Sequence, residues 1–356
     1  MIPVNRPPQP ALGYHCGVLA EAYLHRLDPF VFQITETLGL RWYGVAYIAG
    51  FFTAWLIFRW MSKKKLSTLK LERAGDLVFA CVIGVLAGGR VGFGLFYDPS
   101  MFIAFSADFP WWEVLAIHRG GMSSHGGILG VLVVFVFWGR KNGVAPLHLF
   151  DMGAVCTTPG LFYGRIANFI NGELWGKRLP SELQEAPPWW SVKYPSEITD
   201  VWLSNPLGHT EELVAVDALQ ATVIGGASFY QNIVSEIYAG NEAVTQSIKP
   251  LLTAWYPSQI FQSLAEGPIL LLALIALWWK PRKPGVVSGW FLVLYGFMRI
   301  FTEAYRQPDV GVNIVAGLSR GQLLSVFMIA VGGAIITTCA KRDAEKLGGF
   351  FQTAAG

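Results

Sequence analysis

Apolar residues in this chain gather in seven long blocks, separated by segments rich in charge, glycine or proline. Each block is close to the roughly 20 residues that a helix needs to cross the hydrocarbon core of a bilayer. The blocks lie at residues 42–61, 76–97, a shorter one that ends near 138, 148–171, 257–279, 286–306 and 321–339. The pattern predicts an all-α polytopic membrane protein with seven transmembrane helices.

Basic residues cluster after alternate blocks. The clusters are Lys63, Lys64, Lys65, Lys70 and Arg73, then Arg140 and Lys141, then Lys280, Arg282 and Lys283, and finally Lys341, Arg342 and Lys346. Loops on the cytoplasmic side of a membrane carry an excess of Lys and Arg. The alternation therefore predicts an N-terminus outside the cytoplasm and a C-terminus inside it.

Two polar regions are expected to lie outside the bilayer on the side of the N-terminus. One is the proline-rich segment 1–40, and the other is the long region 172–256, which we expect to form a head region with an amphipathic helix near 230–248. The predicted organisation is an outer segment 1–40, helices one to four in 41–171, the head insertion 172–256, helices five to seven in 257–340 and a cytoplasmic tail 341–356.

Composition agrees with the block pattern. The 356 residues are 53% hydrophobic and 14% charged, which is too apolar for an ordinary soluble protein. The net charge of +3 is small, and the basic residues mark topology rather than a nucleic-acid surface. The four cysteines form no CxxC motif and no disulfide framework, so we predict neither a metal site nor a cofactor.

The stretch GRIANFINGELWG, residues 164–176, carries the densest polar chemistry inside an apolar block. Ionisable residues at membrane depth usually serve function. Arg165 and Asn168 are three residues apart and would share one helix face, where a guanidinium and an amide can hold an anionic group together. The alternative is a helix-end cap combined with hydrogen bonds between helices.

Further charges are predicted at the same depth as Arg165. In the sixth block, Glu303 follows Arg299 by four residues and precedes Arg306 by three, so these residues can form a structural ion-pair ladder. Such a ladder would leave Arg90, Arg165 and Arg320 without a counter-ion, and we expect a phospholipid phosphate to neutralise them. Positive charge on the outer side opposes the usual bias, which strengthens this expectation.

His125 lies in the glycine-rich segment GGMSSHGG, residues 120–127, at the outer start of the third block. Glycine permits tight turns and close backbone approach around such a side chain. One alternative is that Gly126 and Gly130 form a GxxxG helix contact. Another is a serine hydrolase using Ser123 or Ser124, although no nucleophile elbow is visible.

Seven segments together resemble one family, the prolipoprotein diacylglyceryl transferases of bacterial inner membranes. They are DPFVFQI with GLRWYG in 28–44, GGRVGFGLFYDP in 88–99, GGMSSHGG, GRIANFINGELWG, YPSQIFQ in 256–262, LYGFMRIFTEAYRQPD in 294–309 and LSRGQLLS in 318–325. The segments follow the order of the family and touch all seven blocks. Family members commonly carry His, Glu and Met where this chain has Tyr256, Gln262 and Arg320.

The resemblance implies transfer of the diacylglyceryl group of phosphatidylglycerol to the lipobox cysteine of preprolipoprotein signal peptides. Glycerol 1-phosphate would be released, and the site would face the periplasm. The resemblance also implies that Arg165 binds the lipid and that His125 and Arg299 are needed for activity, while other residues line the site. We accordingly assign His125, Arg299, Tyr43 and Glu303 to catalysis, and Arg165, Asn168, Glu173, Gly176 and Arg306 to phospholipid binding.

The chemistry of these side chains suits such a reaction. An arginine-rich pocket lowers the pKa of a substrate thiol, which is ordinarily near 8.5, and meets the charge that develops on a leaving phosphate. We hypothesise that His125 accepts the thiol proton or positions the thiol, that Arg165 and Arg299 clamp the phosphate, and that Glu303 orients Arg299. The alternative from another class is a transporter or flippase for an anionic phospholipid, which would use the same outward arginines.

Overall fold

The computed structural model describes residues 21–33, 39–107, 109–221, 229–307 and 319–351. The chain divides into two compact units. The helical unit consists of Asp28–Leu174 and Ser258–Gly356, and the head unit consists of Met1–Leu27 and Trp175–Pro257. Each unit is described separately below.

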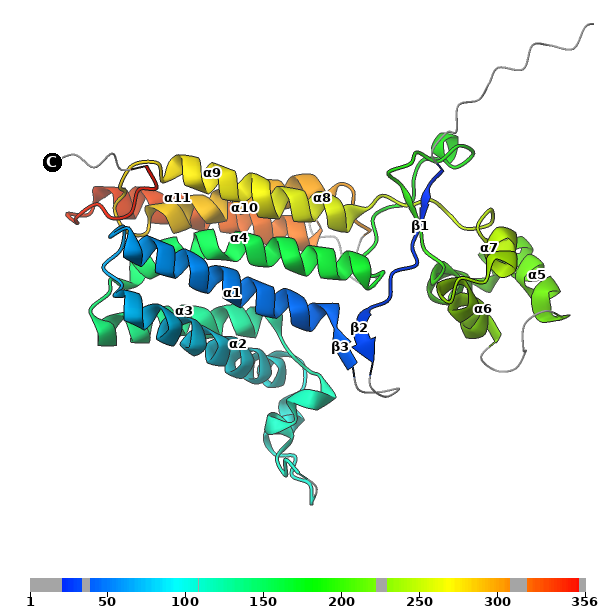
Figure 1. The fold of residues 1–356 in the computed structure, drawn as a ribbon, viewed down its shortest axis with the longest axis horizontal. Coiled ribbons are helices and arrows are strands. Elements are labelled where there is room, and N and C mark those ends of the chain that lie inside the picture. Colours follow the sequence, from blue (N-terminus) through cyan, green and yellow to red (C-terminus); the bar gives the residue numbers. More distant parts are fainter. Residues whose placement is uncertain (1–20, 34–38, 108, 222–228, 308–318, 352–356) are drawn as a thin grey trace, which may run out of the picture. The chain divides into compact units, whose positions relative to one another are not determined.

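Helices occupy every one of the predicted apolar blocks in the helical unit (Figure 1). They are α1 (Trp42–Lys63), α2 (Ala74–Phe96), α3 (Ser124–Asn142), α4 (Pro146–Ile170), α8 (Ser258–Leu264), α9 (Leu270–Leu277), α10 (Val286–Glu303) and α11 (Arg320–Lys341). A π-helical segment, Ala265–Ile269, joins α8 to α9, so these three form one continuous helical block.

Five helical segments in the described part of the chain are long and apolar enough to cross a membrane. They are Trp42–Lys63, Leu71–Phe96, Ser258–Leu277, Val286–Glu303 and Gly321–Lys341. The protein is therefore a mainly helical, multi-pass membrane protein. The helices α3 and α4 fall outside this set, and α4 carries the polar side chains His148, Asp151 and Arg165.

Helix α4 lies at the centre of the helical unit, where it contacts α1, α3, α8, α9 and α10. The outer pairs are α2 with α3 and α10 with α11, which run side by side in Figure 1. Leu149 and Met152 of α4 pack with Leu274 and Trp278 in a core from which solvent is fully excluded. A helix surrounded by other helices can hold polar side chains, because its neighbours supply their partners.

Glycines bring α2 and α3 into backbone contact. A methyl group added at Gly88 would lie 2.9 Å from the Cα of Gly130, and one added at Gly92 would lie 2.6 Å from the Cα of Gly126. The structure thus confirms the alternative reading of Gly126 and Gly130 as a helix contact of the small-residue type. This contact fixes the start of α3, where His125 lies.

A carboxylate from α4 caps the N-terminus of α10. The Oδ2 atom of Asp151 accepts a hydrogen bond from the backbone N–H of Gly285 at 2.8 Å, and its Oδ1 atom accepts from that of Ser288 at 2.7 Å. Gly285 is the N-cap residue of α10 and has no side chain to supply such an acceptor. Asp151 is buried, so the two N–H groups have no water to replace it.

We expect Asp151→Ala to destabilise the helical unit by about 2 kcal/mol, because two buried N–H groups would lose their acceptor. Thermal unfolding of the purified protein in detergent measures this. The matched control is Asp76→Ala, because Asp76 is exposed and pairs only with Arg73 among the contacts recorded for it. We expect the control to change stability by less than about 0.5 kcal/mol; equal stability of the two variants would contradict the capping role.

Two short strands precede α1 in the helical unit. The strand β2 (Phe30–Gln33) pairs antiparallel with β3 (Gly39–Arg41), with Phe30 opposite Arg41 and Gln33 opposite Gly39. The guanidinium of Arg41 lies over the ring of Phe30 at 4.5 Å from its centroid. Since α1 begins directly after β3, this hairpin fixes the position of Tyr43.

The described part of the head unit has three short helices and two short strands. The helices are α5 (Thr210–Asp217), α6 (Phe229–Tyr238) and α7 (Glu242–Ile248), and the strands β1 (Tyr23–Leu24) and β4 (Val192–Lys193) form a parallel pair. The single amphipathic helix expected near 230–248 is wrong, because the chain turns at Gly240, whose φ is +86°. Both resulting helices contribute to the core, for example through Ile233 and Ile248.

A buried carboxylate also organises the head unit. Glu197 accepts hydrogen bonds from the backbone N–H of Thr253 at 2.9 Å and from the indole N–H groups of Trp202 and Trp255 at 3.3 and 3.2 Å. Burial raises the pKa of this carboxyl above its ordinary value, while the N–H donors act in the opposite direction.

Short 3-10 turns connect the larger elements of both units. They lie at Leu71–Arg73, Pro99–Phe102, Glu113–Leu115, Ile117–Arg119, Ser181–Leu183, Pro206–Gly208 and Ala218–Ala221, and a π-helical turn lies at Ile198–Trp202.

Candidate active site

Four charged side chains from three helical segments form a continuous chain of ion pairs, which we call the arginine cluster: Arg165, Glu266, Arg299 and Glu303. The Nε atom of Arg165 lies 3.2 Å from Oε2 of Glu266, and Nη1 of Arg299 lies 3.5 Å from Oε1 of the same carboxylate. On its other side, Nη2 of Arg299 lies 3.0 Å from Oε2 of Glu303. The carboxylate of Glu266 thus bridges the two guanidinium groups, and Glu303 pairs with Arg299 alone among these ion pairs.

The cluster is largely shielded from solvent. The Glu266 side chain is 0% exposed, those of Arg299 and Glu303 are each 11% exposed, and that of Arg165 is 18% exposed. The pair of Arg299 with Glu303, four residues apart on α10, confirms one step of the predicted ladder. Glu303 also accepts a hydrogen bond from the hydroxyl of Ser319, the N-cap residue of α11, at 3.1 Å.

A second polar cluster lies at the C-terminal end of α4. The amide nitrogen of Asn168 donates to Oε1 of Glu173 at 3.0 Å and also to the hydroxyl of Tyr43, which itself donates to Oε1 of Glu173. The backbone carbonyl of Glu173 accepts from Nε2 of Gln259 on α8 at 2.6 Å. The structure therefore brings together three of the predicted site residues from α1, α4 and the loop after α4.

Glu173 is exposed on one side, yet the groups around its carboxyl desolvate it and raise its pKa above the ordinary value. Because Asn168 follows Arg165 by three residues on α4, the two clusters lie on adjacent turns of one helix face. This arrangement supplies hydrogen-bond donors beside a pair of guanidinium groups, which suits a polar headgroup attached to a phosphate.

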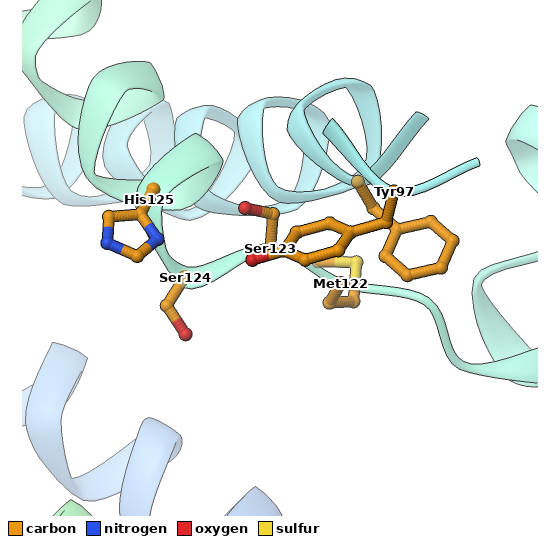
Figure 2. Close-up of a pocket in the computed structure, with 6 residues that line it drawn as sticks. Tyr97, Met122, Ser123, Ser124 and His125 are labelled. Atoms are coloured by element: carbon orange, nitrogen blue, oxygen red, sulfur yellow. The ribbon is translucent and has the colours of Figure 1, made fainter. Parts of the chain in front are cut away.

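His125 occupies a different position. Figure 2 shows it in the first turn of α3, beside a pocket of about 290 Å³ that it shares with Tyr97, Met122, Ser123 and Ser124. Phe93 of α2 completes the lining. The hydroxyl of Ser123 caps α3 by accepting from the backbone N–H of Gly126 at 3.3 Å, so this serine has a structural partner. His125 is exposed, and its ring is thus accessible to a ligand that enters the pocket.

Arg90 has internal partners, which corrects the expectation that it needs a lipid phosphate. Its guanidinium donates to the backbone carbonyls of Val114 at 2.9 Å, Gly120 at 2.5 Å and Gly121 at 3.0 Å, and also to that of Glu113. These acceptors satisfy a guanidinium without any ligand. Arg90 therefore holds the loop between α2 and α3, which leads to His125.

Arg165 is likewise paired inside the protein, so the expectation that the ladder leaves it without a counter-ion is wrong. Its partner, Glu266, lies in the fifth apolar block and was not among the residues predicted from the sequence. A carboxylate inside an otherwise apolar span is a signal for a functional site, and it was available in the sequence. The cluster holds two arginines and two glutamates, so its formal charge is close to balanced before a ligand binds.

The two remaining predicted residues make backbone hydrogen bonds. The backbone N–H of Arg306 donates to the carbonyl of Glu303 at 3.2 Å as α10 ends. Gly176 belongs to the head unit, where its N–H donates to the carbonyl of Tyr256 at 3.1 Å. The Arg320 side chain is outside the part of the molecule that the structure describes.

Comparison with known proteins decides the family. A family model described as Prolipoprotein diacylglyceryl transferase matches residues 29–338. The chain belongs to this family. The match includes α1 to α4, the head unit from Trp175 onward and most of α11, so it covers both clusters and the His125 pocket.

Three relatives illustrate how closely this prolipoprotein diacylglyceryl transferase family member follows the others. Each is named phosphatidylglycerol--prolipoprotein diacylglyceryl transferase. The protein of Bdellovibrio bacteriovorus is 36% identical over 92% of this chain and 97% of its own length, that of Xylella fastidiosa strain 9a5c is 35% identical over 87% and 92%, and that of Oleidesulfovibrio alaskensis is 32% identical over 90% and 95%.

Among the residues that the structure describes, no group of three or more His, Cys, Asp or Glu side chains is arranged to hold a metal ion. The polar side-chain groups of the two clusters and the His125 pocket are guanidinium, carboxylate, amide, hydroxyl and imidazole groups.

Proposed function

We propose that this protein transfers the diacylglyceryl group of phosphatidylglycerol to the cysteine thiol of a preprolipoprotein. Membership of the family and the names of relatives that match almost the full chain support the activity. The structural observation that carries the proposal is the arginine cluster, in which two shielded guanidinium groups from α4 and α10 meet. A lipid phosphate is the anion that such a pair suits at a membrane.

The reaction forms one bond and breaks one bond. The thiolate sulfur bonds to the glyceryl carbon as the bond between that carbon and the phosphate oxygen breaks, which yields a thioether. The electron pair leaves with the oxygen, so glycerol 1-phosphate is released, and the thiol proton must pass to a base or to water. Arginines at the phosphate stabilise the charge that grows on the leaving group.

Each predicted site residue receives a role in this proposal. Arg165 and Arg299 bind the phosphate, and Glu303 orients Arg299. Asn168 and Glu173 hold the hydroxyls of the glycerol headgroup, and Tyr43, which is assigned to catalysis, is positioned by its hydrogen bonds with these two residues. His125 accepts the thiol proton or positions the thiol in its pocket. Gly176 and Arg306 keep their predicted assignment to phospholipid binding.

The membrane arrangement follows from the basic loops. We propose seven transmembrane helices in the bacterial inner membrane, with α3 and α4 spanning as well, a periplasmic N-terminus and a cytoplasmic C-terminus. Segment 1–40 and the head insertion 172–256 would lie in the periplasm, and the tail 341–356 in the cytoplasm. Residues 41–171 would form transmembrane helices one to four, and residues 257–340 would form helices five to seven. Phosphatidylglycerol would then enter the site from the bilayer, and lipobox signal peptides would be the protein partners.

A transporter or flippase for an anionic phospholipid, the alternative from another class, is not favoured by the family match. One assay distinguishes the two functions. Purified protein is incubated with phosphatidylglycerol labelled in its acyl chains and a peptide that carries a lipobox cysteine. We expect label on the peptide as a thioether, and no label when the cysteine is replaced by serine. Movement of lipid between leaflets without a labelled peptide would contradict the proposal.

A further inference from the structure

Glu266 pairs with both phosphate-binding arginines of the proposed site. Its two oxygens divide between them, with Oε2 facing Arg165 on α4 and Oε1 facing Arg299 on α10. We propose that Glu266 is a positioning residue that holds these two guanidinium groups side by side for the phosphate of the lipid. This inference rests on the proposed function and adds a residue to which no role has been assigned.

The π-helical backbone around Glu266 sets the direction of its side chain. The residue lies in the π-helical segment Ala265–Ile269, between α8 and α9, and Pro268 lies inside the same segment. Proline has no N–H and disturbs regular α-helical hydrogen bonding, and single π-helical turns occur often at functional sites. The extra residue in this turn shifts the direction of the side chains that follow α8.

The helix that carries Arg165 approaches closely at the same point. A methyl group added at Gly267 would lie 2.7 Å from the Cβ atom of Phe162 on α4. Phe162 precedes Arg165 by three residues, so it lies on the same helix face. The absence of a side chain at Gly267 therefore allows α4 to come within ion-pair distance of Glu266.

The charge balance of the cluster gives Glu266 a second effect. The negative charges of Glu266 and Glu303 balance the positive charges of the two guanidinium groups. An incoming phosphate must therefore replace carboxylate contacts of the arginines, because the site carries no net positive charge beforehand. Removal of one buried carboxylate would leave a net positive charge, which binds an anion more tightly in a low-dielectric site. Glu266 thereby limits the affinity for the lipid and for the released glycerol phosphate, while it fixes the geometry for reaction.

Gln262 provides a built-in comparison. It precedes Glu266 by four residues, and its Oε1 atom accepts a hydrogen bond from Nη1 of Arg299 at 2.8 Å. A carboxylate at this position would face the same guanidinium that Glu266 faces with Oε1. Exchanging the two residues, in the double variant Gln262→Glu with Glu266→Gln, moves the carboxylate by one helical turn and leaves the composition unchanged.

The test measures the kcat and KM for phosphatidylglycerol, and inhibition by glycerol phosphate, in the transfer assay on purified protein. We expect Glu266→Gln to lower kcat about 100-fold, because both guanidinium groups lose their orientation. We also expect its KM to fall and glycerol phosphate to inhibit it more strongly, because the site gains positive charge. The exchange variant should have a kcat about tenfold higher than that of Glu266→Gln, because the carboxylate at position 262 holds Arg299 again.

Controls separate this role from folding and from the activity itself. Ser263→Ala removes a buried hydroxyl from α8 that bonds only the carbonyl of Ile260 among the contacts recorded for it, and should retain the wild-type kcat. Should Glu266→Gln not fold, Glu266→Asp keeps the charge on a shorter side chain, and it should show lowered kcat with unchanged inhibition by glycerol phosphate.

Three outcomes overturn the assignment of Glu266. The first is a wild-type kcat in Glu266→Gln. The second is a lowered kcat in Glu266→Gln while neither its KM nor the glycerol phosphate concentration needed for inhibition falls. The third is an exchange variant that is no more active than Glu266→Gln. If Glu266→Gln does not fold, a wild-type kcat in Glu266→Asp has the same meaning. A wild-type protein that transfers no label to the peptide would instead refute the proposed function.

Discussion

Replacing Arg165 by alanine is expected to reduce diacylglyceryl transfer at least about 100-fold. The guanidinium is the group on α4 that lies beside both the arginine of α10 and the donors of the Asn168 cluster. Without it the leaving phosphate loses one of its two cationic contacts, and the loss is felt most in the transition state, where charge on that group is largest. The measurement is kcat/KM for phosphatidylglycerol with the labelled lipid and the lipobox peptide.

Arg165→Ala also affects stability, and the two effects can be separated. The variant leaves Glu266 fully buried with one cation in place of two, which we expect to cost about 3 kcal/mol. The double variant Arg165→Ala with Glu266→Gln removes the buried charge as well and should regain most of the thermal stability. Transfer should remain low in the double variant. Recovery of transfer together with stability would mean that Arg165 serves only to compensate Glu266.

A lysine at position 165 distinguishes charge from geometry. Lysine keeps the positive charge but presents a point charge in place of a planar group with several donors. We expect Arg165→Lys to keep the stability of the wild type and to transfer at a rate between those of the wild type and Arg165→Ala. This result would show that the directed donors of the guanidinium contribute beyond its charge.

Much of the helical architecture could be predicted because it depends on local patterns. Apolar blocks of the length of a membrane span are visible in the sequence, and a helix occupies each of them. The pair of Arg299 with Glu303 was predictable because four residues make one helical turn. The shared face of Arg165 and Asn168 followed from the same rule. The family resemblance named His125, Tyr43 and Glu173, although their spacing alone would not have joined them.

The partners of the arginines could not be predicted because they come from distant segments. Arg165 and Glu266 are 101 residues apart, and their contact depends on how α4 packs against the π-helical turn. Arg90 is satisfied mainly by backbone carbonyls of a loop, which leave no trace in residue identity. The sequence therefore revealed how many cations the helices carry, while the structure revealed which of them are already compensated.

The break in the expected head helix has a local cause that the sequence did contain. Gly240 takes a left-handed conformation that other residues rarely adopt, and Asn241 directly after it caps α7 by accepting from the N–H of Val244 at 3.3 Å. A glycine that ends one helix, followed by an asparagine that caps the next, marks a break between two helices. The apolar periodicity continues across both residues, so the pattern alone predicts one helix.

His125→Gln is expected to lower kcat for transfer by about 100-fold or more while the KM for phosphatidylglycerol stays close to that of the wild type. Glutamine approximates the reach and hydrogen bonding of the imidazole but cannot accept a proton near neutral pH. The side chain lines a pocket together with Ser124 and Tyr97, and no residue of the arginine cluster is among the residues that line this pocket. In the proposed function the arginine cluster binds the lipid and His125 serves the thiol, so the two kinetic constants should respond differently.

The pH dependence of the variant tests which of the two proposed roles His125 fills. A free thiol has a pKa near 8.5, so raising the pH from about 7 to about 9 ionises most of the peptide cysteine without any base. If His125 takes the thiol proton, the ratio of variant to wild-type kcat should rise roughly tenfold over this range. If His125 only positions the thiol, the ratio should stay constant.

A second histidine supplies the matched control. His209 lies in the head unit, where its ring is 3.7 Å from the carboxylate of Glu212, and His209→Gln should transfer at the wild-type rate at both pH values. A wild-type rate in His125→Gln would remove His125 from the site. The proposed function places the acceptor cysteine in the pocket around His125. Such a result would separate that pocket from the reaction and leave the arginine cluster as the single proposed anchor for both substrates.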